Sequence, residues 1–226
     1  MPTVSDTAYP RLKSHPTERE LEIIYTPTAE ERDLAQQSTK GQAAYIGFLI
    51  LLKTFQRLGY PVPVSDVPAA IVQHIVVTSQ MAITRANLAS YDASSTRKRH
   101  LAVIRTFLNL RPYRSEAQAV MLSAMEFAIM NKHDLVDLIN IAIEELVRQR
   151  YELPSFSRLL RTARKVRHRA NQAIYAHVSD SLSAASKQQI DSLLQAETET
   201  ETQTTDWNRL KQDPGRPTIG RFNRAN

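Results

Sequence analysis

The side chains of this sequence best suited to chemistry are cations at helical spacing between Ser155 and His177. At about 100° per residue, one side of such a helix is apolar and holds Phe156, Leu159, Ala163, Val166, Ala170 and Ala173. The remaining surface holds Arg158, Arg161, Arg164, Lys165, Arg167, His168 and Arg169. The stretch contains no carboxylate, although a solvated helix face usually pairs Glu with Lys or Arg four residues later. The pattern predicts binding to the phosphates of a nucleic acid. The alternatives are an ordinary solvated face and a membrane-surface helix, and the small Ala and Val side chains of the stripe argue against the latter.

A second basic cluster stands at the expected start of another helix. It follows a short segment, Arg85 to Tyr91, and a polar turn. This order is typical of the helix-turn-helix motif, whose second helix reads base edges with its N-terminal residues. Cations in a first turn oppose the helix dipole by about 0.3 to 1 kcal/mol each, which a bound anion would offset. We expect DNA contacts from Thr96, Arg97, Lys98, Arg99 and His100, with Arg105, Arg111 and Arg114 extending the surface. Alternatively, Arg97 packs its stem beside Leu101 and Ile104.

Catalytic and metal-binding patterns are weak. The six histidines form no HExxH or HxH pair, and the chain has no cysteine, so neither a thiolate metal site nor a thiol nucleophile exists. Paired carboxylates such as Glu30-Glu31 and Glu144-Glu145 are typical of helix starts and solvent faces. We therefore expect no enzyme activity from this chain, no metal and no cofactor.

The distribution of charge supports a polyanionic partner. The chain has 226 residues, 29 Lys plus Arg against 23 Asp plus Glu, and a net charge of +6. Residues 94–114 hold six basic and no acidic residues, 115–146 hold one and six, and 147–177 hold eight and one. Two basic blocks separated by an acidic one predict two docking surfaces on DNA. The N-terminus is not of the signal-peptide type, and the longest apolar run is too short to span a bilayer. We expect a cytoplasmic, nucleoid-associated protein without membrane contact.

The pattern of caps and apolar residues predicts an all-α fold. Capping boxes begin short helices at Thr17 and Thr28, and an apolar helix runs from Gln42 to Leu58 before Gly59 and Pro61. Ser65 or Asp66 is expected to cap the next segment, which periodicity favours as a helix while its valines allow a strand. Further helices are expected from Thr96, Ser115, Asp134, Ser155 and Ser183, with only five glycines to form tight turns.

These elements suggest two consecutive multi-helix modules with helix-turn-helix-like elements. We expect an N-terminal arm over residues 1–16, a first DNA-binding module over 17–114 and a second over 115–211, which includes the long basic helix. An acidic loop is expected at 197–205, a docked turn at Trp207 and Leu210, and a linker and tail over 212–226.

An ordered series of short motifs resembles the N-terminal region of the Tn-three family of replicative transposases. The motifs span nearly the whole chain: Ile24-Tyr25-Thr26, Tyr45-Ile46-Gly47-Phe48, Gly59-Tyr60-Pro61, Val67-Pro68-Ala69-Ala70, Tyr91, Thr96 to Leu101, Ile104-Arg105, Leu110-Arg111-Pro112-Tyr113, Glu144-Glu145-Leu146, Leu153-Pro154, Leu159, Ala163-Arg164, Trp207 to Gln212 and Pro214 to Thr218. The chain departs from the family pattern at Gln42 to Ala44, where a polar Asn-Arg-like pair is expected.

The resemblance implies helical modules that bind the terminal inverted repeats of a transposon and position a separate Mg-dependent, RNase-H-like catalytic domain. That domain would follow this region, so we expect a decayed gene product, a separately encoded DNA-binding piece or a piece cut at a domain boundary.

The function expected is therefore sequence-specific binding of duplex DNA at transposon ends, with the chain itself or the full-length transposase as further partners. The competing hypothesis is a helical protein-interaction module that regulates or inhibits transposase assembly without DNA specificity of its own.

Overall fold

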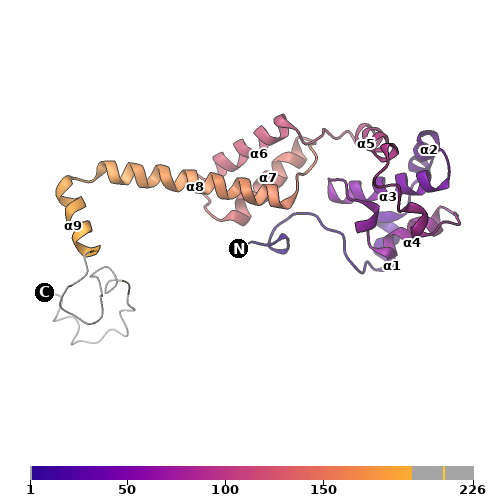
Figure 1. The fold of residues 1–226 in the computed structure, drawn as a ribbon, viewed down its shortest axis with the longest axis horizontal. Coiled ribbons are helices and arrows are strands. Elements are labelled where there is room, and N and C mark those ends of the chain that lie inside the picture. Colours follow the sequence, from indigo (N-terminus) through magenta and orange to yellow (C-terminus); the bar gives the residue numbers. More distant parts are fainter. Residues whose placement is uncertain (1, 195–210, 212–226) are drawn as a thin grey trace, which may run out of the picture. The chain divides into compact units, whose positions relative to one another are not determined.

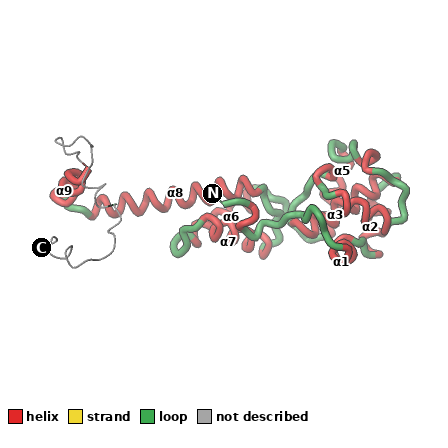
Figure 2. Tube along the Cα trace, turned by 90° about the horizontal axis from the view of Figure 1, so that it is seen from below, coloured by secondary structure: helices red, strands yellow, loops and turns green. Residues whose placement is uncertain are grey.

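The computed structural model describes residues 2–194 and 211, and within these residues it contains helices and no β-strand. The all-α prediction is confirmed. Figures 1 and 2 show the α-helices joined by loops and short helical turns. Their bounds are α1 Glu18–Glu20, α2 Ala29–Ser38, α3 Gln42–Leu58, α4 Ala69–Thr78, α5 Ser95–Phe107, α6 Ser115–Ala128, α7 Leu135–Arg148, α8 Phe156–Ser181 and α9 Ala184–Leu194. The short turns are η1 Val4–Asp6, η2 Leu21–Tyr25, η3 Val64–Asp66 and η4 Arg85–Leu88.

Several helix ends are those that the sequence predicts. The Thr17 and Thr28 side chains accept from the backbone N–H three residues later, each within a capping box. Asp134 caps α7 through a bond of 2.6 Å from the Val136 N–H. Gly59 ends α3 with a left-handed φ of 73°, which a side chain would make costly.

Two predicted helix starts were wrong. Pro68, and not Ser65 or Asp66, is the N-cap of α4, because those two residues lie in the separate turn η3. Helix α5 begins earlier than Thr96, since the Ser94 hydroxyl accepts from the Arg97 N–H at 3.1 Å and acts as its cap. The segment before α5 also differs from the prediction: η4 is a single 3₁₀ turn and not an α-helix.

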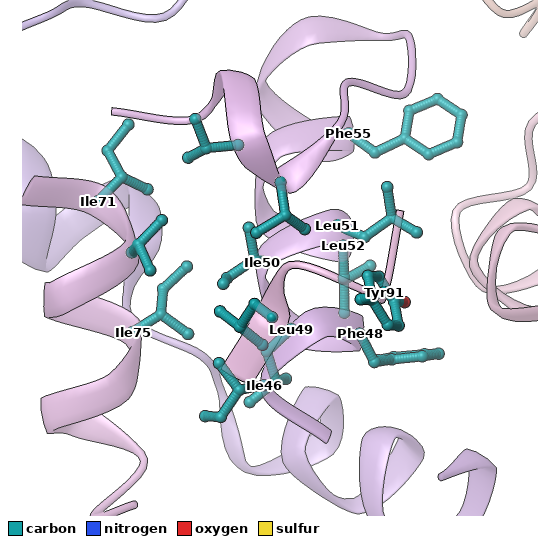
Figure 3. Packing of buried hydrophobic residues seen from close by; sticks show 14 of the residues in the cluster. Ile46, Phe48, Leu49, Ile50, Leu51, Leu52, Phe55, Ile71, Ile75 and Tyr91 are labelled. Atoms are coloured by element: carbon teal, nitrogen blue, oxygen red, sulfur yellow. The ribbon is translucent and has the colours of Figure 1, made fainter. Parts of the chain in front are cut away.

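Helix α3 is the centre of the hydrophobic core formed by helices α1 to α5. Every residue from Ile46 to Phe55 is buried, as expected for a helix that is apolar on all sides. Figure 3 shows its side chains together with Ile71 and Ile75 of α4 and with Tyr91 from the loop before α5. The helical alternative for residues 69–78 is therefore the correct one.

One charged pair lies within this apolar region. Lys53 of α3 donates to both carboxylate oxygens of Glu31 at 3.2 and 3.1 Å, and both side chains are less than a tenth exposed. Glu31 also accepts from the backbone N–H of Thr28 at 2.8 Å. The same carboxylate thus caps α2 and holds α2 against α3, which satisfies its buried oxygens.

The remaining helices of the first compact unit, Met1–Arg169, are α6, α7 and the N-terminal part of α8. Figures 1 and 2 show α6 and α7 side by side along α8. Helix α8 buries Leu159, Leu160, Ala163 and Val166, and these residues recur at helical spacing. The side opposite this buried stripe of α8 is left to polar residues.

The N-terminal arm and residues 151–154 join these helices to the core around α3. Leu153 N–H donates to Gly59 O at 2.9 Å, and Glu152 N–H donates to Arg111 O at 2.9 Å. The Tyr9 ring stacks on Tyr60 with centroids 5.1 Å apart, and its hydroxyl donates to Pro154 O at 2.9 Å. We call this set of contacts the Tyr9 junction.

The chain divides into two compact units, Met1–Arg169 and Ala170–Asn226. This division falls within α8, whereas the boundary expected between the two modules lies at residue 114. The contacts of the Tyr9 junction join residues on both sides of that expected boundary. The expected acidic loop at 197–205, the docked turn at Trp207 and Leu210 and the tail over 212–226 lie outside the described residues.

Candidate nucleic-acid interface

The cations of α8 lie at the surface, as a nucleic-acid contact would require. Arg158, Arg161, Arg164, Lys165, His168 and Arg169 are exposed, and Arg167 is half-buried. In the described part of the chain, none of these seven forms an ion pair with a carboxylate. The only acidic residue of α8 is Asp180, more than two turns beyond Arg169. The positive charge of this face is therefore uncompensated.

Four of these cations line a groove between α6 and α8 of about 420 Å³. The helices that form it lie side by side in Figure 1. Its walls are Tyr113, Gln118, Met121, Leu122, Arg158, Arg161, Thr162, Lys165 and Arg169, with no carboxylate among them. The Arg158 guanidinium lies 5.5 Å from the centre of the Tyr113 ring, within the range of a cation–π contact.

Helix α5 divides its cations between the surface and the interior. Lys98 and Arg99 are exposed, and Thr96 is half-buried. With Lys40 and Thr39, the side chains of Thr96 and Arg99 line a second polar cavity of about 290 Å³. Sequence analysis did not include Lys40, because nothing in the sequence indicates that its loop approaches α5.

Arg97 points into the fold. Its Nη2 donates to the carbonyl of Val62 at 3.1 Å, its Nε lies 3.5 Å from Asp92 Oδ1, and its side chain is only 17% exposed. Asp92 also accepts from the N–H groups of Val64 and Ser65 at 2.8 and 3.1 Å. Arg97 therefore ties the start of α5 to the loop before η3.

His100 is buried at 2% exposure, although the sequence suggested a DNA contact. Its Nδ1 shares a hydrogen bond of 2.6 Å with the Tyr91 hydroxyl, and its ring meets Phe48 edge-on at 5.1 Å. Burial lowers the pKa of His100 below the ordinary value of 6.5, and the nearby Arg99 charge lowers it further. The structure leaves this imidazole no exposed edge for a base.

The three cations expected to extend the α5 surface have different environments. Arg105 forms two hydrogen bonds to the buried Glu152 carboxylate, the longer of them 3.2 Å. Arg111 pairs with Glu116, and its guanidinium lies 4.3 Å from the centre of the Tyr151 ring. Arg114 is exposed at the start of α6. Only Arg114 of the three is unpaired among the described residues.

The groove wall opposite α8 was missed by sequence analysis. In the sequence, Tyr113 stands out only as part of the motif Leu110-Arg111-Pro112-Tyr113, and Gln118 belongs to no motif. The sequence offers one clue, since Gln118 and Leu122 are one helical turn apart on α6. Which helix faces them depends on the fold.

An apolar groove lies on the other flank of α6. It has a volume of about 600 Å³ between α6 and α7 and is lined by Ala119, Val120, Ser123, Ala124, Phe127, Ile141, Glu144, Glu145, Arg148 and Gln149. Phe127 at its edge is 81% exposed. An exposed aromatic ring beside an apolar groove is typical of protein contact surfaces.

Metal and membrane sites were also sought. Among the described residues, no three His, Asp or Glu side chains are grouped to hold a metal ion. In the same part of the chain, no helix combines the length and the apolar character needed to cross a bilayer.

Comparison with known proteins agrees with the family resemblance. The chain is 27% identical over 199 residues to the transposase for transposon Tn3926 of Escherichia coli and 26% identical over 200 residues to that for Tn501 of Pseudomonas aeruginosa. The transposase for Tn1546 of Enterococcus faecium is 22% identical over 208 residues. These alignments cover 87 to 91% of this chain but only 20% of each relative. The chain thus spans about a fifth of the length of these transposases.

Residues 3–166 match a family described as "Domain of unknown function (DUF4158)". The match includes α1 to α7, the basic cluster of α5 and the part of α8 that borders the groove as far as Lys165, whereas Arg167, His168 and Arg169 lie outside it. Since it covers well over half of the sequence, the chain belongs to the DUF4158 family.

Proposed function

We propose that this chain binds duplex DNA at the ends of a transposon, as part of transposition. The observation that carries the proposal is the face of α8, where seven cationic or imidazole side chains meet no carboxylate among the described residues. Such uncompensated charge stabilises a complex with phosphates by releasing their counterions. The similarity to transposases gives the biological setting.

The proposed contacts divide into two groups. Exposed cations of α8, Lys165 among them, neutralise phosphates, and Lys98 and Arg99 on the first turns of α5 read base edges, with Arg114 nearby in sequence at the start of α6. Arg97, His100 and Arg105 act instead within the fold, since each is engaged by Val62, Tyr91 or Glu152. Arg111 is held by Glu116 and contributes less.

Salt dependence and sequence preference separate these groups. The four α8 cations that line the groove with α6 make six charges together with Lys98 and Arg99, so log affinity should fall with log salt at a slope of about −5. Lys165→Ala should weaken binding to all duplexes alike and reduce the slope by about one. Arg99→Ala should cost about 1 to 3 kcal/mol on transposon-end DNA and much less on random DNA.

The experiment is fluorescence anisotropy with transposon-end and random duplexes over a salt series. Arg97→Ala is the structural control: it should lower the free energy of unfolding while leaving the preference for end DNA nearly intact. Equal losses on both duplexes for Arg99→Ala and Lys165→Ala would overturn the division of labour. Absence of binding at low salt would overturn the function.

We infer further that strand cleavage is not performed by this chain alone. The described residues offer no cluster of acidic side chains to hold Mg²⁺. Incubation with supercoiled transposon DNA and Mg²⁺ should therefore yield no nicked product, whereas metal-dependent nicking by the purified chain would contradict this inference.

A second function is favoured by a separate observation. The apolar groove between α6 and α7, with Phe127 exposed at its edge, suits a protein partner within a transposase assembly. If DNA binding is absent and Phe127→Ser abolishes association with a transposase, this chain acts as a helical interaction module that regulates assembly.

A further inference from the structure

The seven cationic or imidazole side chains of α8 occupy one arc of about 200° around the helix axis, and only part of this arc borders the groove against α6. With about 100° between successive residues, Arg158, Arg161, Lys165 and Arg169 fall within an arc of about 100°, and these four line the groove against α6. Arg164, Arg167 and His168 continue the same arc beyond Arg161 and are not among the residues that line the groove. The helix therefore presents two sets of cations in two different environments.

The groove is shaped for an extended anion. It is open to solvent along α8, its volume is about 420 Å³, and its α6 wall supplies an amide from Gln118 beside apolar Met121 and Leu122. Along α8 the four cations stand 3, 4 and 4 residues apart, a spacing that stacks them in one row. At about 1.5 Å per residue, the row from Arg158 to Arg169 is about 16 Å long.

One end of the groove is organised before any ligand binds. The Tyr113 hydroxyl lies 3.7 Å from Met121 Sδ, which fixes the ring against α6, and the Arg158 guanidinium lies over that ring. Burial raises the pKa of Tyr113 above its ordinary value of 10, so the phenol keeps its proton at neutral pH. Arg158 is therefore held over a neutral ring with N–H donors that no carboxylate among the described residues occupies.

We propose that the groove between α6 and α8 is the binding site for the sugar–phosphate backbone of one DNA strand. The inference rests on the proposed duplex binding. It adds which α8 cations contact the DNA and that they contact the backbone of a single strand. One strand winds through about half a turn in five nucleotides, so a straight row of about 16 Å follows its backbone over roughly three successive phosphates. The four groove cations contact these phosphates, Gln118 and Thr162 complete the hydrogen bonds, and the α8 cations that do not line the groove remain in solvent.

A matched pair of substitutions tests the assignment. Arg161→Gln removes a groove charge, and Arg164→Gln removes the same charge about one turn along α8, at a position that does not line the groove. Both side chains are exposed and no ion pair of either is observed among the described residues, so both variants should melt at the wild-type temperature. Arg161→Gln should weaken duplex binding about tenfold and lower the salt slope by about one, whereas Arg164→Gln should change affinity less than about twofold.

A second pair tests the opposite wall. Gln118→Glu places a carboxylate in the groove, and Ser123→Glu adds the same charge to the far flank of α6. The first should weaken duplex binding about tenfold through repulsion of phosphate, and the second should leave it nearly unchanged. This comparison separates local repulsion from the general effect of net charge.

A neutral backbone tests the strand geometry. Five consecutive methylphosphonate linkages, placed in one strand at a time and moved along the duplex, remove the charges that the groove would grip. At one position in one strand, the neutral linkages should strongly weaken duplex binding by the wild-type chain. They should weaken binding by the Arg161→Gln variant little further, because the effects of removing two groups that contact each other do not add.

The outcomes distinguish the groove from the function. If the wild-type chain does not bind duplex DNA at low salt, the proposed function fails. If it binds, but Arg161→Gln and Arg164→Gln lose affinity equally, or the methylphosphonate effect is the same in both strands, duplex binding stands and the groove assignment is wrong.

Discussion

Two arginines of one helix turn have opposite roles because they point in different directions. Arg97 lies on the side of α5 that carries Leu101 and Ile104, and its guanidinium reaches the Val62 carbonyl and Asp92. Arg99 is exposed, and its Nη2 donates to the Thr96 hydroxyl at 3.5 Å. A basic run at a helix start therefore mixes residues that hold the helix in place with residues that are free to bind.

His100 shows the same effect for a titratable group. Its imidazole lies among Tyr91, Phe48 and Arg99, with the backbone of Ser38 partly opposing the shift of its pKa. Burial, the main cause, disfavours the charged form. The neutral imidazole is thus part of the folded core.

This burial predicts a loss of stability in mild acid. The folded-state pKa of His100 lies below the unfolded value of 6.5, so its contribution to stability is complete above pH 6.5 and is lost as pH falls through the folded pKa. Urea unfolding at about pH 7 and about pH 5 should give a smaller difference for His100→Phe than for the wild type. His74 is a necessary comparison, because burial lowers its pKa as well.

An NMR titration of the imidazole side chains gives the direct measurement. A His100 resonance that titrates at or above pH 6.5 would contradict the assignment of burial as the dominant effect.

At the scale of the elements, packing around α3 imposes one strict requirement. A Cβ on Gly47 would lie 2.8 Å from ring atoms of Tyr91, closer than side chains tolerate. The glycine therefore lets the loop before α5 approach α3, and through Tyr91 it also places the bond to His100.

Gly47→Ala should lower the free energy of unfolding by about 1 to 3 kcal/mol, because the Tyr91 ring must move out of a packed core. In an open helix position the same change would stabilise by about 0.5 to 1 kcal/mol. The sign of the change in a urea titration is therefore decisive, and a more stable variant would mean that Tyr91 does not pack against α3 as described.

The segment before α5 decides whether the structure contains the first helix of a helix-turn-helix motif. In that motif two α-helices flank a tight turn, whereas here α5 follows the 3₁₀ turn η4, and the preceding α-helix, α4, ends at Thr78. The cap at Ser94 still directs the first turns of α5, with Lys98 and Arg99, toward solvent. The structure thus retains an exposed basic helix start without the two-helix form of the motif.

At the scale of the whole molecule, the Tyr9 junction joins the helices that carry the two basic clusters. Tyr9 is buried against Tyr60 at the end of α3 and against Phe156 at the start of α8, with the latter ring 5.7 Å away. The Arg105–Glu152 pair holds α5 to the residues that lead into α8. Both sets of contacts lie within the unit Met1–Arg169.

These contacts predict that Tyr9 keeps the two clusters at a fixed separation. The chain has no cysteine, so Lys98→Cys and Lys165→Cys can carry the only two spin labels. Double electron–electron resonance should give one narrow distribution of distances between the two labels. The distribution should broaden in Tyr9→Ala and stay narrow in Tyr9→Phe, because phenylalanine preserves both ring contacts.

Tyr175→Ala serves as the control, since that tyrosine is 62% exposed. A distance distribution that is equally narrow in Tyr9→Ala would show that Tyr9 does not keep the two basic clusters at a fixed separation. This measurement needs no DNA, so it is independent of the proposed function.

The sequence by itself determined the helical fold class, the caps at Thr17, Thr28 and Asp134, the central position of α3 and the exposed cations of α8. Each of these depends on interactions between residues one to four positions apart, which the order of the residues specifies directly. Tertiary structure decided which cations are free: Arg97 meets a carbonyl 35 residues away and Arg105 a carboxylate 47 residues away. It also formed the α6–α8 groove, because a groove requires two helices to face each other. Helical periodicity in the sequence shows which residues share a face of one helix, but it does not show which other helix packs against that face.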